Sequence, residues 1–219
     1  MKRHMKRISA PRTWALPRKE NKFVTRPYPG PHKKELGTSL EFFFKVMLNT
    51  VKTKREVNHL LQTQEVLLNG KRKKDRRTPV GFLDVIAIPK AKEYYTITLN
   101  RDGFLDAQSI TAKEAVQRYC KLVRKTPMKK KVQLNFLDGT TLTVDDAKKY
   151  ALGDTLVLSI PEHKLLEHIP ANKGSKIIIY AGTNRGTQST IKDIEGKQVI
   201  FEKDGASIST KKEYAIAIA

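Results

Sequence analysis

Hydrophobic and polar positions along the chain predict two helices near residue 50 and strands almost everywhere after them. The first helix is predicted over residues 40–48, because five apolar residues share one helical face there: Leu40, Phe43, Phe44, Met47 and Leu48. Thr38 and Glu41 have the spacing of a capping box at its start. The second helix begins at Thr53, which pairs in the same way with Glu56 and precedes an apolar stripe of Val57, Leu60 and Leu61.

A β-hairpin is predicted directly after the second helix. The strand over residues 65–68 runs into Asn69-Gly70, a strong hairpin signal because both residues tolerate a positive φ. A strand over residues 84–88, ended by Pro89, is expected to cover the two helices. These elements predict a first folded unit over residues 38–90.

From residue 94 onward the pattern is one of short strands separated by turns. One short helix is predicted from a capping box at Thr111 and Glu114 to about Cys120. The other elements are strands, predicted over residues 95–99, 132–136, 142–144, 155–160 and 165–169. Strands at such intervals favour a small barrel or sandwich, so residues 91–170 are predicted to form a central, mainly β domain.

Residues 171–219 repeat the strand pattern as a separate unit. A strand over residues 177–180 leads into the glycine-flanked loop 182–186 and a second strand over residues 187–194, and a last strand is predicted over residues 215–219. The fold class expected for the whole chain is therefore α+β and multi-domain.

Residues 1–37, referred to below as the arm, differ in composition from the rest. The arm holds half of the chain's ten prolines, and eleven cations against two acids. It has too few apolar residues to bury a core, so it is expected to be extended in the free protein. Trp14, Phe23 and Tyr28 lie among the cations, and either stacking on bases or docking on the next domain accounts for them.

Charge indicates the partner. Lys and Arg number 43 and Asp and Glu number 22 in 219 residues, a formal net charge of +21. Self-repulsion at that charge opposes folding, so nucleic acid is the expected main partner. The single cysteine, Cys120, excludes an internal disulfide, is expected in the core, and favours a reducing intracellular compartment. No apolar run approaches the ~20 residues that span a bilayer, and no apolar stretch follows the basic N-terminus, so neither a membrane partner nor a secretory signal is expected.

The sequence contains no convincing catalytic or metal-binding pattern. Gly182 and Gly186 have the wrong spacing for a phosphate loop, and the five histidines include no pair at helical ligand spacing. Asp145-Asp146 is placed where a helix would begin, which favours a capping role. Phe82-Leu83-Asp84 lacks the arginine of the Arg-Leu-Asp motif of RNA pseudouridine synthases. We therefore expect no enzyme activity, no catalytic residue, no cofactor, no metal and no small-molecule substrate.

The strongest functional signal is a group of cations on the second helix and the hairpin. Lys54 and Arg55 open the helix, and residues 71–77 carry six cations and one acid. This pattern predicts a compact positive surface on a rigid support, which contacts phosphates and recognises a folded RNA by its shape.

Several motifs resemble those of a known family. Thr53-Lys54-Arg55-Glu56 together with Val66–Lys71 resembles the α-L RNA-binding module. Ala10-Pro11-Arg12 with Trp14, then Arg26–Lys33, then Val80–Ile86 resemble small-subunit ribosomal protein four of the archaeal and eukaryotic type. Residues 174–194 are similar to the KOW motif at the C-terminal end of that family.

The resemblance implies a ribosomal protein without catalytic activity. Such a protein binds small-subunit ribosomal RNA, contacts neighbouring ribosomal proteins, takes part in translation and subunit assembly, and resides in the cytoplasm within the small ribosomal subunit. It implies an α-L RNA-binding module over residues 38–90 and a KOW-like, SH3-like β-barrel over residues 171–219, preceded by the extended basic arm.

The residues expected to contact RNA lie in the arm, on the module and on one loop of each β domain. They are Lys2, Arg3, Lys6, Arg7, Arg12, Trp14, Arg26, Lys33, Lys34, Thr53, Lys54, Arg55, Lys71, Arg72, Lys73, Lys74, Arg76, Arg77, Lys129, Lys130, Lys131, Asn184 and Arg185.

Alternatives to this interpretation stay open from the residues alone. One is an RNA-modifying enzyme that docks through the same module and has its catalytic domain within residues 91–170. Another is a transcription-associated KOW protein, which has no reason to carry the basic arm. The loop 182–186 either contacts phosphate through Arg185 or is only a hairpin whose glycines satisfy the turn.

Overall fold

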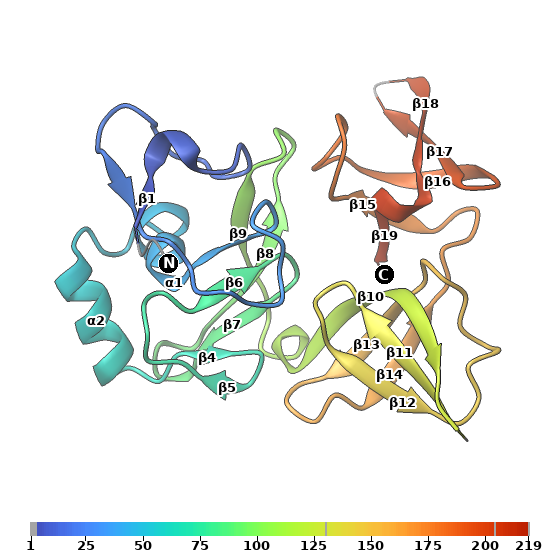
Figure 1. The fold of residues 1–219 in the computed structure, drawn as a ribbon, viewed down its shortest axis with the longest axis horizontal. Helices are drawn as coiled ribbons and strands as arrows, with labels where there is room; N and C mark the ends of the chain where they lie inside the picture. The colour runs from blue at the N-terminus through green and yellow to red at the C-terminus, as the bar shows by residue number, and fades with distance from the viewer. Residues whose placement is uncertain (1–3, 130, 204, 219) are drawn as a thin grey trace. The chain divides into compact units, whose positions relative to one another are not determined.

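The structure is a computed structural model that describes residues 4–129, 131–203 and 205–218, and it divides into two compact units. Within the described part of the chain, unit 1 contains residues 4–98 and 104–118, and unit 2 contains residues 99–103 and 119–218. Figure 1 shows α1 and α2 in unit 1 and five labelled strands, β15 to β19, in the C-terminal part of unit 2. The chain is thus mainly β, with its α-helices near the N-terminal end of the sequence.

The first predicted helix exists but is irregular. α1 (Leu40–Phe42) continues directly as the π-helical segment η2 (Phe43–Met47). Its cap is Ser39, whose hydroxyl accepts a hydrogen bond from a backbone amide, and not the predicted pair of Thr38 and Glu41. The Glu41 carboxylate is buried and engaged in an ion pair, so it is not available to the cap.

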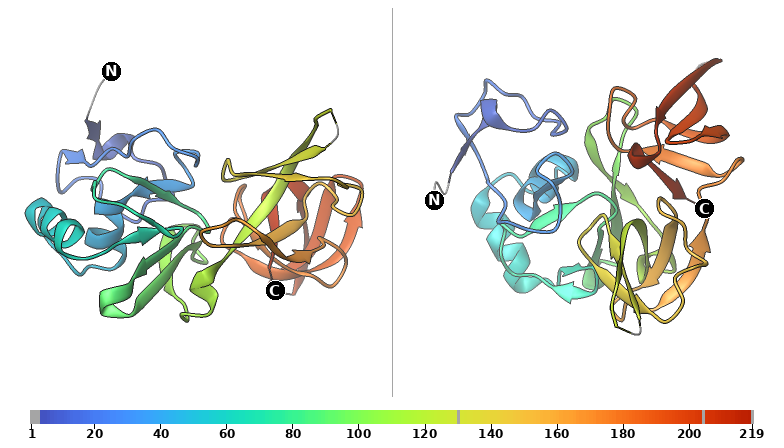
Figure 2. Two further views of the ribbon diagram at one scale, coloured as in Figure 1. Left: turned by 90° about the horizontal axis from the view of Figure 1, so that it is seen from below. Right: turned by 45° about the vertical axis from the view of Figure 1, so that its right-hand side comes forward.

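The second helix, α2 (Lys54–Thr63), confirms its prediction from the sequence. The Thr53 hydroxyl accepts from the Glu56 amide at 3.2 Å, and the Glu56 carboxylate accepts from the amides of Thr53 at 3.3 Å and Lys52 at 2.8 Å. These bonds, with that from Lys52 contributing most, hold the pKa of Glu56 below its usual value. The buried face of α2 presents Val57 and Leu61. Figure 2 shows α2 at the edge of unit 1 in both views.

A five-stranded sheet in the order β5-β4-β7-β8-β9 supports the helices of unit 1. Its strands are β4 (Leu67–Leu68), β5 (Lys71–Arg72), β7 (Val85–Ile88), β8 (Glu93–Leu99) and β9 (Leu105–Ser109). The predicted hairpin is present: Leu68 pairs with Lys71, and Asn69 and Gly70 have φ of 48° and 76°, as a type I′ turn requires. Because β7 pairs with β8, the sheet continues past the predicted domain boundary at residue 90.

The arm is folded onto unit 1 in the structure, which corrects the expectation of an extended segment. β1 (Met5–Lys6) pairs with β2 (Phe23–Val24), and η1 (Arg7–Ser9) lies between them in sequence. Trp14 is 1% exposed, its indole nitrogen donates to the Gly37 carbonyl at 3.1 Å, and its ring lies 4.8 Å from that of Phe42. One buried tryptophan therefore supplies the apolar anchor that the arm's composition does not suggest.

A second attachment holds the end of the arm to a short two-stranded sheet. β3 (Gly37–Ser39) pairs with β6 (Pro79–Gly81). A side chain at Gly81 would place its Cβ 2.3 Å from the His32 ring, so only glycine permits this approach.

Asp84 lies at the centre of a buried polar network in unit 1. One carboxylate oxygen accepts from His32 Nε2 and from the Gly81 amide, both at 2.8 Å, and the other accepts from Asn69 Nδ2 at 2.8 Å and lies 3.7 Å from Arg118. Burial alone raises the pKa of Asp84, but His32 and Arg118 outweigh it, so the pKa is below its usual value. The network joins the arm, the hairpin and two strands through one carboxylate.

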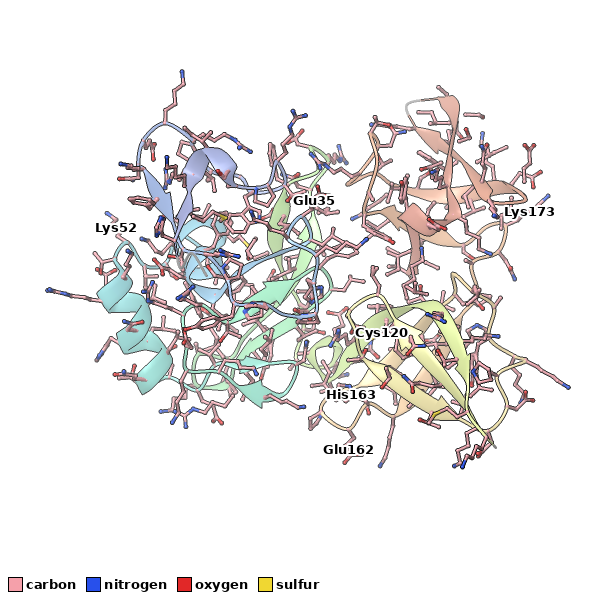
Figure 3. The ribbon with its side chains drawn as sticks, in the orientation of Figure 1. Glu35, Lys52, Cys120, Glu162, His163 and Lys173 are labelled. Atoms are coloured by element: carbon pink, nitrogen blue, oxygen red, sulfur yellow. The ribbon has the colours of Figure 1, made fainter. Side chains whose placement is uncertain are left out.

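The N-terminal part of unit 2 is a five-stranded sheet in the order β12-β11-β10-β13-β14. Its strands are β10 (Gln117–Pro127), β11 (Val132–Phe136), β12 (Thr141–Val144), β13 (Thr155–Ser159) and β14 (Leu165–Ile169). The helix predicted up to Cys120 is wrong: its capping box forms, but it opens only the 3₁₀ turn η4 (Glu114–Val116) before β10 begins. Cys120 is buried as predicted, on a strand, and Figure 3 labels it among the strands.

No helix begins at Asp145-Asp146, which lie in an irregular segment after β12. Asp146 accepts from the Lys148 amide at 2.9 Å, and Asp145 lies 3.2 Å from Lys131. The predicted capping role is therefore wrong, because these carboxylates support a turn.

The C-terminal part of unit 2 is a sheet in the order β18-β17-β16-β15-β19. Its strands are β15 (Lys176–Ile179), β16 (Gln188–Glu195), β17 (Gln198–Lys203), β18 (Ala206–Lys211) and β19 (Ala215–Ile218), with the 3₁₀ turn η5 (Lys212–Tyr214) before β19. Buried side chains pack into its core: Ile177, Ile179, Ile191, Val199 and Phe201. A smaller core of Val157, Ile169, Ala171 and Ala217 joins this sheet to β13.

A buried lysine strengthens the same junction. Lys121 on β10 is 3% exposed, and its ammonium donates to the backbone carbonyls of Lys212 at 3.0 Å, Glu213 at 2.7 Å and Ala215. It also lies 5.3 Å from the centre of the Tyr180 ring. Burial lowers the pKa of Lys121 to about 7, and burial raises that of Tyr180 to about 12.

Candidate nucleic-acid interface

Five cations of α2 and the hairpin project into solvent and are referred to below as the basic cluster. They are Lys54, Arg55, Lys71, Arg72 and Lys74. In Figure 3 the neighbouring Lys52 marks the start of α2. Four of the five are on α2 or β5, whose backbone positions are fixed, so the basic cluster has the properties of a phosphate-binding surface.

The hairpin that carries part of the basic cluster is rigidly supported. Asn69 at its turn donates to Asp84, and its side-chain oxygen accepts from the Val85 amide at 2.9 Å. The strand β4 is hydrogen-bonded on both sides, to β5 and to β7. The cations at the tip are therefore presented on a fixed backbone.

Arg76 and Arg77, which were predicted to contact RNA, have structural partners. Arg76 forms a close ion pair with the buried carboxylate of Glu41. The Arg77 guanidinium lies 4.4 Å from the centre of the Tyr28 ring and donates through Nε to the Arg26 carbonyl at 3.1 Å. Both arginines are half-buried. Arg76 ties its loop to α1 through Glu41, and Arg77 holds the arm against the rest of unit 1.

Five of the predicted residues come together around one hollow in unit 1, although they are distant in sequence. This hollow, referred to below as the arm hollow, has a volume of about 590 Å³ and lies between the arm and the helical part of the unit. The predicted residues on its walls are Arg7, Arg26, Lys54, Arg76 and Arg77. His4, Lys22, Phe23 and Lys45 also line it and were not among the predicted contacts. Phe23 was considered for base stacking together with Trp14 and Tyr28, and its position beside Lys22 was the available signal.

The other predicted arm residues are distributed differently. Lys6, Arg12, Lys33 and Lys34 are exposed, as a nucleic-acid contact requires. Trp14 is buried against Phe42, so the prediction that it contacts RNA is wrong and the docking interpretation holds for it. Lys2 and Arg3 lie outside the described residues, as does Lys130 in unit 2.

The remaining predicted residues are placed as follows. Thr53 is exposed and Lys73 is half-buried on the hairpin. In unit 2, Lys129 and Lys131 are exposed near the turn between β10 and β11. Asn184 and Arg185 are half-buried in the loop after β15.

The glycines of that loop serve the turn. Gly182 and Gly186 have φ of 88° and 87°, and the Gly186 amide donates to Ile179 at 2.7 Å. A Cβ at Gly186 would lie 1.9 Å from the Asn100 carbonyl oxygen, while the stem of Arg185 lies close to Gly103. These contacts support the turn interpretation for Gly186. The guanidinium of Arg185 is the charged group of the loop.

No group of three His, Cys, Asp or Glu side chains in the described part of the chain is arranged to hold a metal ion. Among the same residues, no helix has the length and apolar character needed to cross a membrane.

The fold and the interface define a class of protein. Separate small β-rich units, a large net positive charge, and cations gathered on a rigid hairpin and a capped helix are the features of modular nucleic-acid-binding proteins.

Comparisons with known proteins identify the family. Residues 1–35 match the RS4NT (NUC023) domain, and residues 91–165 match the ribosomal family S4e. The small ribosomal subunit protein eS4 of Nanoarchaeum equitans is 36% identical over 196 residues, covering 89% of this chain and 83% of the relative. That of Methanocaldococcus jannaschii is 32% identical and covers 99% of this chain and 94% of the relative.

A solved structure agrees. The crystal structure of the 30S ribosomal protein S4e from Thermoplasma acidophilum matches with a TM-score of 0.73 and 30% identity, covering 84% of this chain and 95% of that chain. This chain belongs to the S4e family of ribosomal proteins.

Proposed function

We propose that this protein is a structural constituent of the small ribosomal subunit and binds small-subunit ribosomal RNA. The names of its relatives support the ribosomal role. The observation that carries the RNA-binding part is the basic cluster, five exposed cations on α2 and a braced hairpin.

The interface binds RNA by holding its cations at fixed positions. Lysine and arginine side chains bind phosphate oxygens through charge-assisted hydrogen bonds, and their spacing on a rigid backbone selects an RNA whose phosphates match it. The positive dipole end of α2 also favours a phosphate beside Lys54 and Arg55, although the capping box already places the Glu56 carboxylate there. No catalytic step is part of this function.

The finer assignments belong to the same proposal. The helices and hairpin of unit 1 serve as an α-L RNA-binding module, and residues 171–219 as a KOW-like, SH3-like barrel. Neighbouring ribosomal proteins are the expected protein partners, and the cytoplasm is the expected location. The order of the β15–β19 sheet and the tight glycine turn after β15 support the barrel assignment.

Sedimentation tests the proposal. The tagged protein should migrate with small subunits on a sucrose gradient and stay there after a high-salt wash. Recovery of the protein only in the soluble fraction, with small subunits intact, would contradict the ribosomal role. Purified protein should also bind small-subunit ribosomal RNA more tightly than an unrelated RNA of equal length at the same salt concentration.

A further inference from the structure

The arm hollow has the size and the walls of a ligand site. Its volume of about 590 Å³ is within the range of pockets that enclose small molecules. One wall is the arm from Asn21 to Arg26, which includes β2. The opposite wall comes from α1 and η2, through Phe42, Lys45 and Val46, and from Lys54 at the start of α2. All of these residues belong to unit 1.

The walls carry a strong excess of positive charge. Seven Lys and Arg side chains line the hollow against one carboxylate, that of Glu41. Glu41 is already engaged by Arg76 and lies 3.8 Å from Lys45. Lys22 and Lys54 have no acidic partner among the residues that the structure describes. A dianionic or monoanionic group is therefore the natural occupant of this space.

An aromatic ring lies beside these cations. Phe23 is 49% exposed although it is part of β2, and it lines the hollow. Lys22 Nζ lies 5.6 Å from the centre of its ring, and the His4 ring meets it edge-on at 5.3 Å. Exposed aromatic rings next to cations are the surfaces on which single-stranded bases stack.

We propose that the arm hollow holds one unpaired nucleotide of RNA, with its base on Phe23 and its phosphate among Lys22, Arg7 and Lys54. The inference rests on the proposed RNA-binding function and adds a specific site to it. A nucleotide within a duplex keeps its base in the stack, so the occupant is a nucleotide of a loop, bulge or single strand. An acidic peptide supplies the charge but not the flat ring that Phe23 favours.

The test measures whether the base of the nucleotide contributes to binding affinity. Labelled hexaadenylate and an abasic hexamer of the same backbone are titrated against the full chain by fluorescence anisotropy. The wild-type protein should bind hexaadenylate about tenfold more tightly than the abasic hexamer, since stacking of one base on an aromatic ring is worth that order of affinity. Phe23→Leu keeps the apolar bulk without the flat ring, and should reduce the preference to about twofold or less.

Two control variants define the site. Phe23→Tyr retains a flat ring and should retain the preference. Ile8→Ala removes a side chain that is 74% exposed on the same arm but does not line the hollow, and should change neither titration. Trp14, the only tryptophan in the chain, reports through its emission that the arm of each variant is still docked.

The outcomes separate this inference from the function on which it rests. Equal binding of the two hexamers by the wild-type protein would overturn the nucleotide site, even where ribosomal RNA is bound normally. The same conclusion follows if hexaglutamate binds as tightly as hexaadenylate and depends equally on Phe23. Absence of binding to small-subunit ribosomal RNA by the wild-type protein contradicts the proposed function itself.

Discussion

At the scale of single residues, buried charged side chains connect segments that are far apart in the sequence. Asp84 joins the arm to the hairpin through His32, 52 residues away, and Lys121 reaches carbonyls 91 to 94 residues further along the chain. Such contacts leave no periodic trace in the sequence, which is why pattern reasoning did not find them. The sequence Phe82-Leu83-Asp84 lacks the arginine of a catalytic Arg-Leu-Asp motif, but in the fold Asp84 is a buried structural carboxylate with a different arginine, Arg118, beside it.

Lys121 is expected to make the stability of unit 2 depend on alkaline pH. Burial lowers the pKa of Lys121 in the folded chain from its usual value of 10.5 to about 7, and Lys212 adds to this effect while Glu213 opposes it. Between these values the unfolded chain holds a proton that the folded chain has released. The free energy of unfolding should therefore rise with pH, by at most about 1.4 kcal/mol per pH unit from this group.

Urea unfolding at pH 7, 8 and 9 measures this effect against the variant Lys121→Met. The variant lacks the titrating group, so the difference in unfolding free energy between wild type and variant isolates it. The unfolding free energy of the wild type should increase relative to that of the variant as pH rises. A difference that stays constant across the three pH values rules the mechanism out.

The loop after β15 allows a second prediction at this scale. Gly186→Ala places a Cβ against the Asn100 carbonyl at a residue with φ of 87°, and should lower the unfolding free energy by about 2 kcal/mol or more. Arg185→Ala should lower it by less, because Arg185 is only half-buried and its replacement leaves the backbone of the turn unstrained. Thermal melts of the two variants give the comparison, and equal melting temperatures would show that the turn tolerates a side chain.

At the scale of elements, capping and turn motifs predicted the local structure correctly. Where a prediction from a local motif failed, pairing between strands distant in sequence decided the structure. The capping box of α2 and the Asn69-Gly70 hairpin are correct because neighbouring residues alone determine them. The capping box at Thr111 also forms, yet its helix stops after one turn, because the chain enters β10 at Gln117 and β10 is the central strand of a sheet between β11 and β13. The neighbouring strands that require β10 lie far along the chain, where the helix pattern does not reach.

The basic cluster gives the prediction at this scale. The variant Lys71→Glu, Arg72→Glu, Lys74→Glu should bind small-subunit ribosomal RNA weakly, and its log affinity should fall with log salt less steeply, by roughly 2 to 3 in slope for three lost phosphate contacts. Arg76 and Arg77 are left unchanged, because Arg76 pairs with the buried Glu41 and Arg77 packs on Tyr28 of the arm, so their removal disturbs unit 1 itself.

A control with the same change in charge accompanies it. Lys148→Glu, Lys149→Glu, Lys197→Glu alters three exposed lysines that the proposal does not use. It should keep the wild-type slope, and both variants should melt near the wild-type temperature. If the two variants show identical salt slopes, the hairpin is not part of the interface.

At the scale of the whole molecule, composition predicted the class of partner but not the state of the arm. Charge and proline content favoured an extended segment, and average composition gave no weight to where Trp14 falls. Its burial against Phe42, with the attachment of His32 to Asp84, is sufficient to order the arm on unit 1. Three residues that were predicted to contact RNA, Lys2, Arg3 and Lys130, lie outside the described residues.

Docking of the arm in the free protein is directly measurable. Trp14 emission should be that of a buried indole and resist quenching by iodide. Gly30→Val would place a Cβ 2.3 Å from Pro79, so it should loosen the arm and shift the emission to longer wavelength. Wild-type emission typical of a solvent-exposed indole would show instead that the arm is undocked before it meets RNA.

The bonds of Lys121 also have a consequence for the order of events during synthesis. All interactions that complete unit 1 are available once residue 118 has emerged, whereas β15 must wait for β19 and Lys121 for residues 212–215. At ~5–20 residues per second, translation of the intervening ninety residues takes about 5 to 20 s, which is longer than most small domains need to fold. Unit 1, which carries the basic cluster, is therefore expected to be finished while unit 2 is still being made.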